Sequence, residues 1–373
     1  MKLSIPKPDL QRALGRIQAI VERRNSMPIL ANVLLEARKE DGGALIVAAT
    51  DLEVGIRSTQ PAKVTKGGAL TVSARKLYDI VRELPEEEVT LGATANSYLE
   101  IHCGRARFSL AGASAEEYPS LPEFPSDKLV RLPSAVLSVM IERTMYAASV
   151  DETRYNLNGA FIEVDAAVGR LRMVATDGHR LAQAERSIGP DVEGLASGVI
   201  VPRKGLTEVK RLVDEEEADE VEIGFAGNSG LVRRGGVTLV MRLIEGEFPD
   251  YRKVIPQGST SFLTLPSEIL IHALRRVAVL SSERSRAVKL ELSERRLVVS
   301  SNNPDLGEAS EELDVDYGGE PLTLGFNVRY LLDAVGALGA KEIRFGLRDG
   351  NSPAQLQPTD DPDALAVVMP MRL

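Results

Sequence analysis

The chain contains 373 residues, of which 43% are hydrophobic and 27% charged, and its formal net charge is −9. This length is too great for one typical hydrophobic core, so we expect two or three domains, and no apolar run reaches the roughly 18 residues of a membrane span. The negative charge argues against nucleic acid as a partner unless the two signs are segregated in space, and the single cysteine, Cys103, excludes an internal disulfide, as in a cytoplasmic protein.

The first predicted element is an amphipathic helix that starts near Lys7, with Asp9 as its expected N-cap. Strand-like runs follow it and end in the phrase ATDLEVGIR at residues 49–57. A second helix is expected over 72–84, and further strands lead to the segment RARFSLAGASAEEYPSLPEF. This first block therefore combines two helices with several strands.

The same order of elements recurs twice along the chain. Opening helices are expected from Leu132 and Leu265, with Ser134 and Ser267 as N-caps. Related phrases and second helices follow in both later blocks: ATDGHRLAQAE at 175–185, SNNPDLGEASEEL at 301–313, and helices over 201–213 and 325–338. Coincidental patterning is the alternative, but shared phrases in one order argue against it. The sequence predicts an α+β fold of three similar domains, with boundaries at 1–126, 127–257 and 258–373.

Charge is distributed unevenly between the predicted helices and the turns. Most polar positions on the six helices are basic, whereas acidic runs such as Glu86–Glu88 fall in turns. Any one such run is explained by a solvated surface. Helices that are basic as a set instead predict a positive surface for sequence-independent, salt-sensitive contacts to phosphate.

Signatures of catalysis are missing from the sequence. It contains no GxxxxGK[ST], GxGxxG or GxSxG motif, and one cysteine with three histidines makes a metal cluster improbable. Asp177 and His179 stand two residues apart, but no nucleophile is indicated nearby. We therefore expect no catalytic residue, no metal and no cofactor, although an enzyme using His179 and a scaffold that binds only peptides remain alternatives.

Several phrases together resemble the bacterial DNA sliding clamp, the beta subunit of DNA polymerase III. They are ATDGHRLA, YNLNG, VPRKG, FPDYRKVIP, NNP, GFNVRYLLD and the terminal VVMPMRL, and they cover the whole chain. The resemblance implies a head-to-tail, ring-shaped homodimer around duplex DNA, with helices lining the hole and sheets forming the outer wall. It implies a processivity factor that tethers the polymerase alpha subunit, the clamp loader delta subunit, other polymerases and repair proteins.

The resemblance also assigns residues to three surfaces. A hydrophobic peptide groove would contain Leu157, Thr176, Gly178, His179, Arg180, Leu181, Pro249, Lys253, Val254, Asn327, Tyr330, Val367, Met369, Pro370, Met371 and Arg372. Contacts to DNA would come from Arg24, Arg75, Arg154, Tyr155, Arg203 and Lys204. The dimer interface would join Lys76, Arg105, Arg107, Phe108 and Leu110 to Val279, Leu280, Asp305, Glu308 and Glu311 of a second copy. Flexible methionines would suit a groove that serves many partners.

Overall fold

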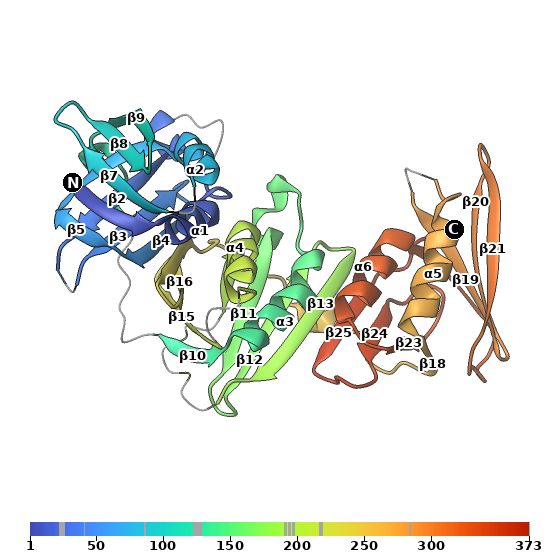
Figure 1. Ribbon diagram of the computed structural model, residues 1–373. Helices are drawn as coiled ribbons and strands as arrows, with labels where there is room; N and C mark the ends of the chain where they lie inside the picture. The colour runs from blue at the N-terminus through green and yellow to red at the C-terminus, as the bar shows by residue number, and fades with distance from the viewer. Residues whose placement is uncertain are drawn as a thin grey trace. The chain divides into compact units, whose positions relative to one another are not determined.

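A computed structural model of the chain describes residues 1–21, 27–40, 42–85, 87–121, 129–189, 192, 195, 198–215, 219–282 and 285–372. Its internal contacts divide it into two compact units, each made of two chain segments. Unit 1 consists of Met1–Ser134 and Thr207–Leu243, and unit 2 consists of Ala135–Leu206 and Ile244–Leu373. Figure 1 shows the helices and strands that form them.

Six α-helices form within the described residues, where the sequence predicts them. They are α1 (Lys7–Ile17), α2 (Ala74–Glu83), α3 (Ser134–Thr144), α4 (Arg203–Val213), α5 (Ser267–Ala278) and α6 (Val328–Leu338). Their apolar positions at helical spacing are buried, and α1 packs on α2 as α5 packs on α6 (Figure 1). None of these helices is long and apolar enough to cross a membrane.

The helices begin differently from the prediction. The expected N-cap Asp9 is wrong, because α1 begins at Lys7 directly after Pro6. Ser134 and Ser267 are likewise the first residues of α3 and α5, and Pro266 occupies the N-cap position of α5. Proline cannot donate a main-chain hydrogen bond, and its φ of −58° at Pro6 suits the change from strand to helix. A strand that ends in proline therefore runs straight into each of these helices.

Unit 1 contains one antiparallel sheet of 13 strands. In spatial order these are β10 (Val130–Pro133), β15 (Glu220–Ala226), β16 (Ser229–Arg234), β17 (Val237–Arg242), β4 (Val54–Pro61), β3 (Ala44–Thr50), β2 (Asn32–Arg38), β6 (Gly68–Ser73), β9 (Ala106–Ala113), β8 (Tyr98–Cys103), β7 (Glu88–Ala93), β1 (Lys2–Pro6) and β5 (Lys63–Lys66). The side chains of β2 alternate between buried and half-buried positions, because successive residues point to opposite faces of the sheet.

Unit 2 contains two antiparallel sheets. The first has the order β14 (Val199–Pro202), β11 (Gly159–Asp165), β12 (Arg170–Thr176), β13 (Arg180–Ser187), β25 (Ala364–Val368), β24 (Ala354–Pro358), β23 (Glu342–Leu347) and β18 (Ser261–Pro266). The second has the order β21 (Gly307–Asp314), β20 (Arg296–Asn303), β19 (Ala287–Ser293) and β22 (Leu322–Asn327). Antiparallel sheets with two helices in each predicted block confirm the α+β fold.

Two equivalent strand pairs join successive blocks of the sequence. In unit 1, β4 pairs with β17, so that Val54 lies opposite Met241. In unit 2, β13 pairs with β25, so that Arg180 lies opposite Val368. The threonine of an ATD phrase stands four residues before both Val54 and Arg180, so the internal repeat of the sequence is also a repeat of strand pairing.

Candidate peptide-binding groove and interfaces

The turn between β12 and β13 exposes two of the predicted groove residues. The Asp177 carboxylate accepts hydrogen bonds from the backbone N–H groups of His179 (2.9 Å) and Arg180 (3.0 Å). The Thr176 hydroxyl donates to the Arg180 carbonyl at 2.7 Å, and Gly178 has a φ of +87°. Glycine adopts this left-handed conformation without steric cost. The turn therefore leaves Gly178 and His179 exposed to solvent.

Arg180 points inward from this turn and ties it to α6. Its guanidinium donates to Asp177 (3.0 Å) and to Asp333 (2.6 Å), and it lies 4.7 Å from the centre of the Tyr330 ring. The His179 ring stacks on the other side of the turn against Tyr330, with 6.2 Å between ring centres. The Arg180 side chain is only 12% exposed, so these contacts are largely screened from water. The turn and Tyr330 are thus held as one wall.

Two further residues contact Arg180, and the sequence did not predict either of them. Asp333 follows Tyr330 by one helical turn on α6, a spacing that could have suggested a shared face. Tyr146 contacts Arg180 from the segment after α3, with 5.3 Å between the guanidinium carbon and the ring centre. Nothing in the local sequence pattern marks Tyr146, because this contact joins residues 34 positions apart. Burial raises the pKa of the Tyr146 hydroxyl, which keeps it neutral.

The floor next to this wall is apolar and buried. Leu181 and Val367 lie opposite each other on β13 and β25, and both pack with Val174 and Tyr251. Leu157 is also buried, but it does not belong to this cluster. Leu181 and Val367 therefore form the floor, while the exposed atoms belong to the residues around them.

The C-terminal tail continues from β25 across the turn. The Met369 N–H donates to the His179 carbonyl at 2.9 Å, and the Met371 N–H donates to the Gly325 carbonyl at 2.8 Å. Met369, Pro370 and Met371 are half-buried, and Arg372 is exposed. Two backbone hydrogen bonds thus fix the tail, while its methionine side chains remain partly accessible.

The segment after Phe248 contributes the predicted rim. Pro249, Lys253 and Val254 are exposed, and Lys253 forms only an exposed ion pair with Asp250 at 3.0 Å. Asn327 caps α6 by accepting hydrogen bonds from two backbone N–H groups, one of them that of Tyr330. All 16 predicted groove residues lie in unit 2, and Asn327 serves the helix as well as the predicted groove.

The residues predicted to contact DNA lie on several elements. Arg75 is exposed on α2, and Arg203 and Lys204 begin α4. Arg154 and Tyr155 are exposed on a short 3₁₀ helix, Glu152–Leu157. The Arg154 guanidinium also donates to the Asp177 carbonyl at 3.3 Å, which connects this segment to the groove turn. Arg24 lies outside the described residues.

The predicted dimer residues fall on two strand edges. In unit 1, β9 pairs with β8 along its length but with β6 only at Gly112 and Ala113, so residues 106–111 keep a free edge among the described strands. In unit 2, β21 pairs with β20 alone. Phe108 on β9 is 39% exposed. Each edge therefore has unpaired main-chain groups beside accessible side chains.

Opposite charges border the two edges. Exposed Lys76, Arg105 and Arg107 lie on or near β9 with half-buried Leu110, and exposed Val279, Asp305 and Glu308 lie on or near β21 with half-buried Leu280. Glu311 differs from the others because Arg276 of the same chain already donates to it at 2.7 Å. That pair lowers the pKa of Glu311 and raises that of Arg276, so both remain charged.

Within the residues that the structure describes, no three His, Cys, Asp or Glu side chains gather in a way that could hold a metal ion. The Asp177 carboxylate next to His179 serves the backbone of the turn and the Arg180 guanidinium.

Comparison with known proteins gives one answer along the whole chain. The N-terminal, central and C-terminal domain profiles of the DNA polymerase III beta subunit match residues 1–122, 131–250 and 252–372. Beta sliding clamps from Caulobacter vibrioides and Vibrio cholerae are 38% and 37% identical to this chain, with 100% of each chain covered. The crystal structure of the DNA polymerase III subunit beta from Pseudomonas aeruginosa is similar over 100% of both chains, with a TM-score of 0.93 and 37% identity. The chain therefore belongs to the DNA polymerase III beta subunit family, the bacterial beta sliding clamps, and is a non-catalytic processivity factor of DNA replication.

Proposed function

We propose that this clamp recruits its partners through the groove between the Thr176–Leu181 turn, Tyr330 and the C-terminal tail. The observation that best supports this proposal concerns the C-terminal tail. Met369 and Met371 are fixed by backbone hydrogen bonds, yet their side chains stay half-buried. A segment that only sealed a core would bury these side chains fully. Partly exposed methionines beside a buried apolar floor suit the docking of apolar side chains from different peptides.

The partners that fit this groove carry short motifs rich in Gln, Leu and Phe. On this proposal they are the replicative polymerase alpha subunit, the clamp loader delta subunit, other polymerases and repair proteins. The apolar side chains of such a motif would contact the half-buried Tyr330, Met369 and Met371, whereas Leu181 and Val367 are buried. Polar groups of the same peptide would bind near His179 and Arg372, which are exposed.

We further propose that two chains close head to tail, with β9 of one copy beside β21 of the other. A contact between two different surfaces forms a ring when its rotation closes. Both strands have a free edge among the described strands, and the charges around the two edges are opposite. These two features support this arrangement. We also propose that each chain of this dimer divides into three domains, with boundaries at 1–126, 127–257 and 258–373.

DNA would pass through the ring, and it would be held by topology more than by affinity. Arg75, Arg154, Tyr155, Arg203 and Lys204, together with Arg24, would contact the phosphate backbone. Such contacts are independent of sequence and weaken with salt. Weak contacts are compatible with sliding, because a closed ring does not need tight binding to remain on its substrate.

The groove is tested by titrating a labelled peptide with a Gln-and-Leu/Phe motif into the Met369→Ala variant. We expect a loss of roughly 2 kcal/mol of binding free energy, because binding energy concentrates in a few anchor side chains. The melting temperature should change little, since Met369 is only half-buried. Ile269→Ala is the matched control, because Ile269 is a 50% exposed apolar residue of unit 2 outside the groove. Unchanged peptide affinity in a folded Met369→Ala protein would contradict the assignment.

A further inference from the structure

A cluster of polar and charged side chains centred on β11 and β12 contains none of the residues that the sequence assigns to a surface. Its centre is the Glu163 carboxylate, which accepts hydrogen bonds from the Tyr251 hydroxyl (2.5 Å) and from Arg252 (2.8 Å to each oxygen). Arg172 also donates to Glu163 at 3.3 Å and to the Tyr251 oxygen at 3.4 Å. Glu185 binds Arg172 from the other side at 2.8 Å. One carboxylate thus collects three donors, two of them from the segment that carries the predicted groove rim.

Tyr251, which the Glu163 carboxylate holds by its hydroxyl, packs against the floor of the predicted groove. The Tyr251 side chain is only 3% exposed and packs with Leu181 and Val367. The Arg252 guanidinium lies over the Tyr251 ring, 4.8 Å from its centre, so the ring is held by its hydroxyl and by its face. Tyr251 therefore connects the charged cluster to the apolar floor.

The backbone around Tyr251 connects the same cluster to the rim. Tyr251 begins a short 3₁₀ turn, and its carbonyl accepts the Val254 N–H at 3.0 Å. The neighbouring Asp250 carbonyl accepts the Lys253 N–H at 3.3 Å. Lys253 and Val254 are exposed, and Lys253 also pairs with Asp250 at 3.0 Å. Their position depends on where Tyr251 and Arg252 are fixed.

The first block of the chain offers an internal comparison. Glu36 lies opposite Ile46 on β2 and β3, in the same register in which Glu163 lies opposite Arg172 on β11 and β12. Ile46 and Arg172 each stand four residues before the threonine of an ATD phrase. The two glutamates are therefore repeat equivalents, but only Glu163 faces an arginine.

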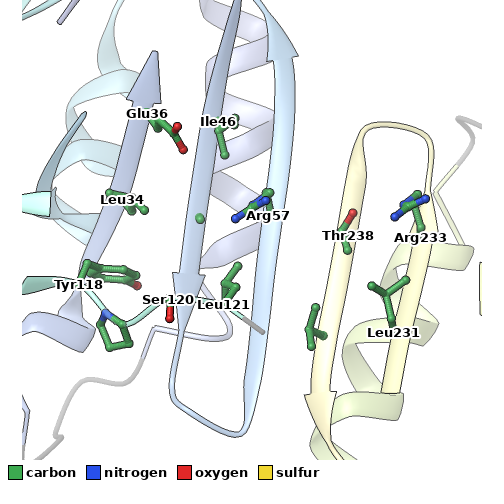
Figure 2. A pocket seen from close by; sticks show the side chains of 13 residues that line it. Leu34, Glu36, Ile46, Arg57, Tyr118, Ser120, Leu121, Leu231, Arg233 and Thr238 are labelled. Atoms are coloured by element: carbon green, nitrogen blue, oxygen red, sulfur yellow. The ribbon is translucent and has the colours of Figure 1, made fainter. Parts of the chain in front are cut away.

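The surroundings of Glu36 lack the other parts of the cluster. Glu36 binds Arg38 of its own strand at 2.8 Å, and Leu121 stands where the repeat places Tyr251, three residues after the aromatic residue of an aromatic–proline pair. Next to Glu36 is a cavity of about 550 Å³, lined among others by Leu34, Arg57 and Leu121 (Figure 2). The glutamate-centred cluster therefore belongs to the second repeat, where the groove lies.

We propose that Glu163 is a positioning residue for peptide docking: it fixes Tyr251 and Arg252 and thereby presets the rim segment Pro249–Val254. The proposal rests on the function proposed for the groove and goes beyond it by naming what holds one wall in place. A preset wall lowers the conformational entropy lost when a peptide docks, which raises affinity without any direct contact to the peptide.

The proposal is tested with Glu163→Gln, which removes the charge, and with Tyr251→Phe, which keeps the ring but removes the hydroxyl. We expect each change to weaken binding of a labelled Gln-and-Leu/Phe peptide about five- to tenfold. Glu163→Gln weakens the hydrogen bond between Tyr251 and residue 163 because the charge is gone, and Tyr251→Phe removes that bond. Glu36→Gln is the matched control at the repeat-equivalent position and should leave peptide affinity unchanged. A melting curve of every variant separates positioning from a general loss of stability.

Hydrogen exchange in the absence of peptide provides the second measurement. The Lys253 and Val254 amides should exchange faster in both variants, whereas amides of β12 and β13 should not change. Peptide affinity within twofold of wild type, or an affinity loss without faster exchange at these two amides, would overturn the proposal. If the wild-type protein itself does not bind the peptide, the groove assignment fails, while the exchange measurement still decides whether Glu163 positions the rim.

Discussion

At the scale of single residues, Arg180 ties the turn between β12 and β13 to α6. Its planar guanidinium bonds Asp177 and Asp333 and lies over Tyr330, which a lysine ammonium cannot reproduce. We expect Arg180→Lys to cost about 1–2 kcal/mol of folding stability, because two nearly buried charged hydrogen bonds lose their geometry. Peptide affinity should fall with it, measured by titration beside a denaturant unfolding curve. Arg329→Lys is the control, since Arg329 on α6 also pairs with Asp333 but has a 63% exposed side chain. Equal behaviour of the two variants would contradict this role of Arg180.

Two carboxylates of unit 2 make the stability of the protein depend on acid pH. Burial raises the pKa of Glu163 and of Asp361, but hydrogen bonds from Tyr251 and Arg252 to Glu163, and from Arg143 to Asp361, outweigh burial, so both pKa values lie below the usual 4.5 and 3.8. A lowered pKa stabilises the fold above the unfolded-state value, and this contribution is lost as pH falls through the lowered value. We expect the free energy of unfolding to decline below pH 4.5. Glu163→Gln should flatten the decline; an unaltered pH profile would exclude Glu163 as a source.

At the scale of elements, the edges of β9 and β21 carry the proposed association of two chains. Unpaired edges of opposite charge attract, so reversing one charge should weaken the dimer and reversing both should restore it. We expect Arg107→Glu to raise the dimer dissociation constant about tenfold, and Arg107→Glu with Glu308→Lys to recover most of this loss. Sedimentation over a concentration series at low and high salt measures both effects. Val168→Glu is the control for added charge, because Val168 is a 61% exposed residue in a turn of unit 2. A wild-type monomer at micromolar concentration would refute the arrangement.

At the scale of the whole molecule, the net charge of −9 is compatible with DNA as a partner if basic helix surfaces face the DNA and the proposed ring holds it by enclosure. We expect the protein, once loaded by a clamp loader, to stay on nicked circular DNA and to leave when the circle is cut. Binding to a short linear duplex should be weak, indifferent to sequence and lost with salt. Gel filtration of labelled protein with circular and linearised DNA measures retention. Tight, sequence-selective binding to a short duplex would be the opposite result.

Much of the fold was predictable because it depends on local patterns. Helical spacing of apolar residues located the six helices, and the repeated ATD phrase marked where strand-like runs end. The helix α1 starts at Lys7 as predicted, but its N-cap is Pro6 and not Asp9, since side-chain capping is a preference and Pro6 can end a strand and precede a helix equally well. The predicted groove residues came from a resemblance between whole phrases. Such a resemblance identifies the residues but does not show which side chains contact one another.

Sequence alone thus determined the repeat, the helices and the composition of the surfaces, because neighbouring residues along the chain set periodicity and turn chemistry. Only the tertiary structure decided which distant residues meet. Tyr146 and Asp333 reach Arg180, and Tyr251 reaches Glu163, across separations of 34, 153 and 88 residues. Such contacts depend on strand pairing and packing that join separate parts of the chain, and no local pattern encodes them. The backbone of the tail is held by hydrogen bonds from Met369 to His179 and from Met371 to Gly325, and only the folded chain brings these residues together.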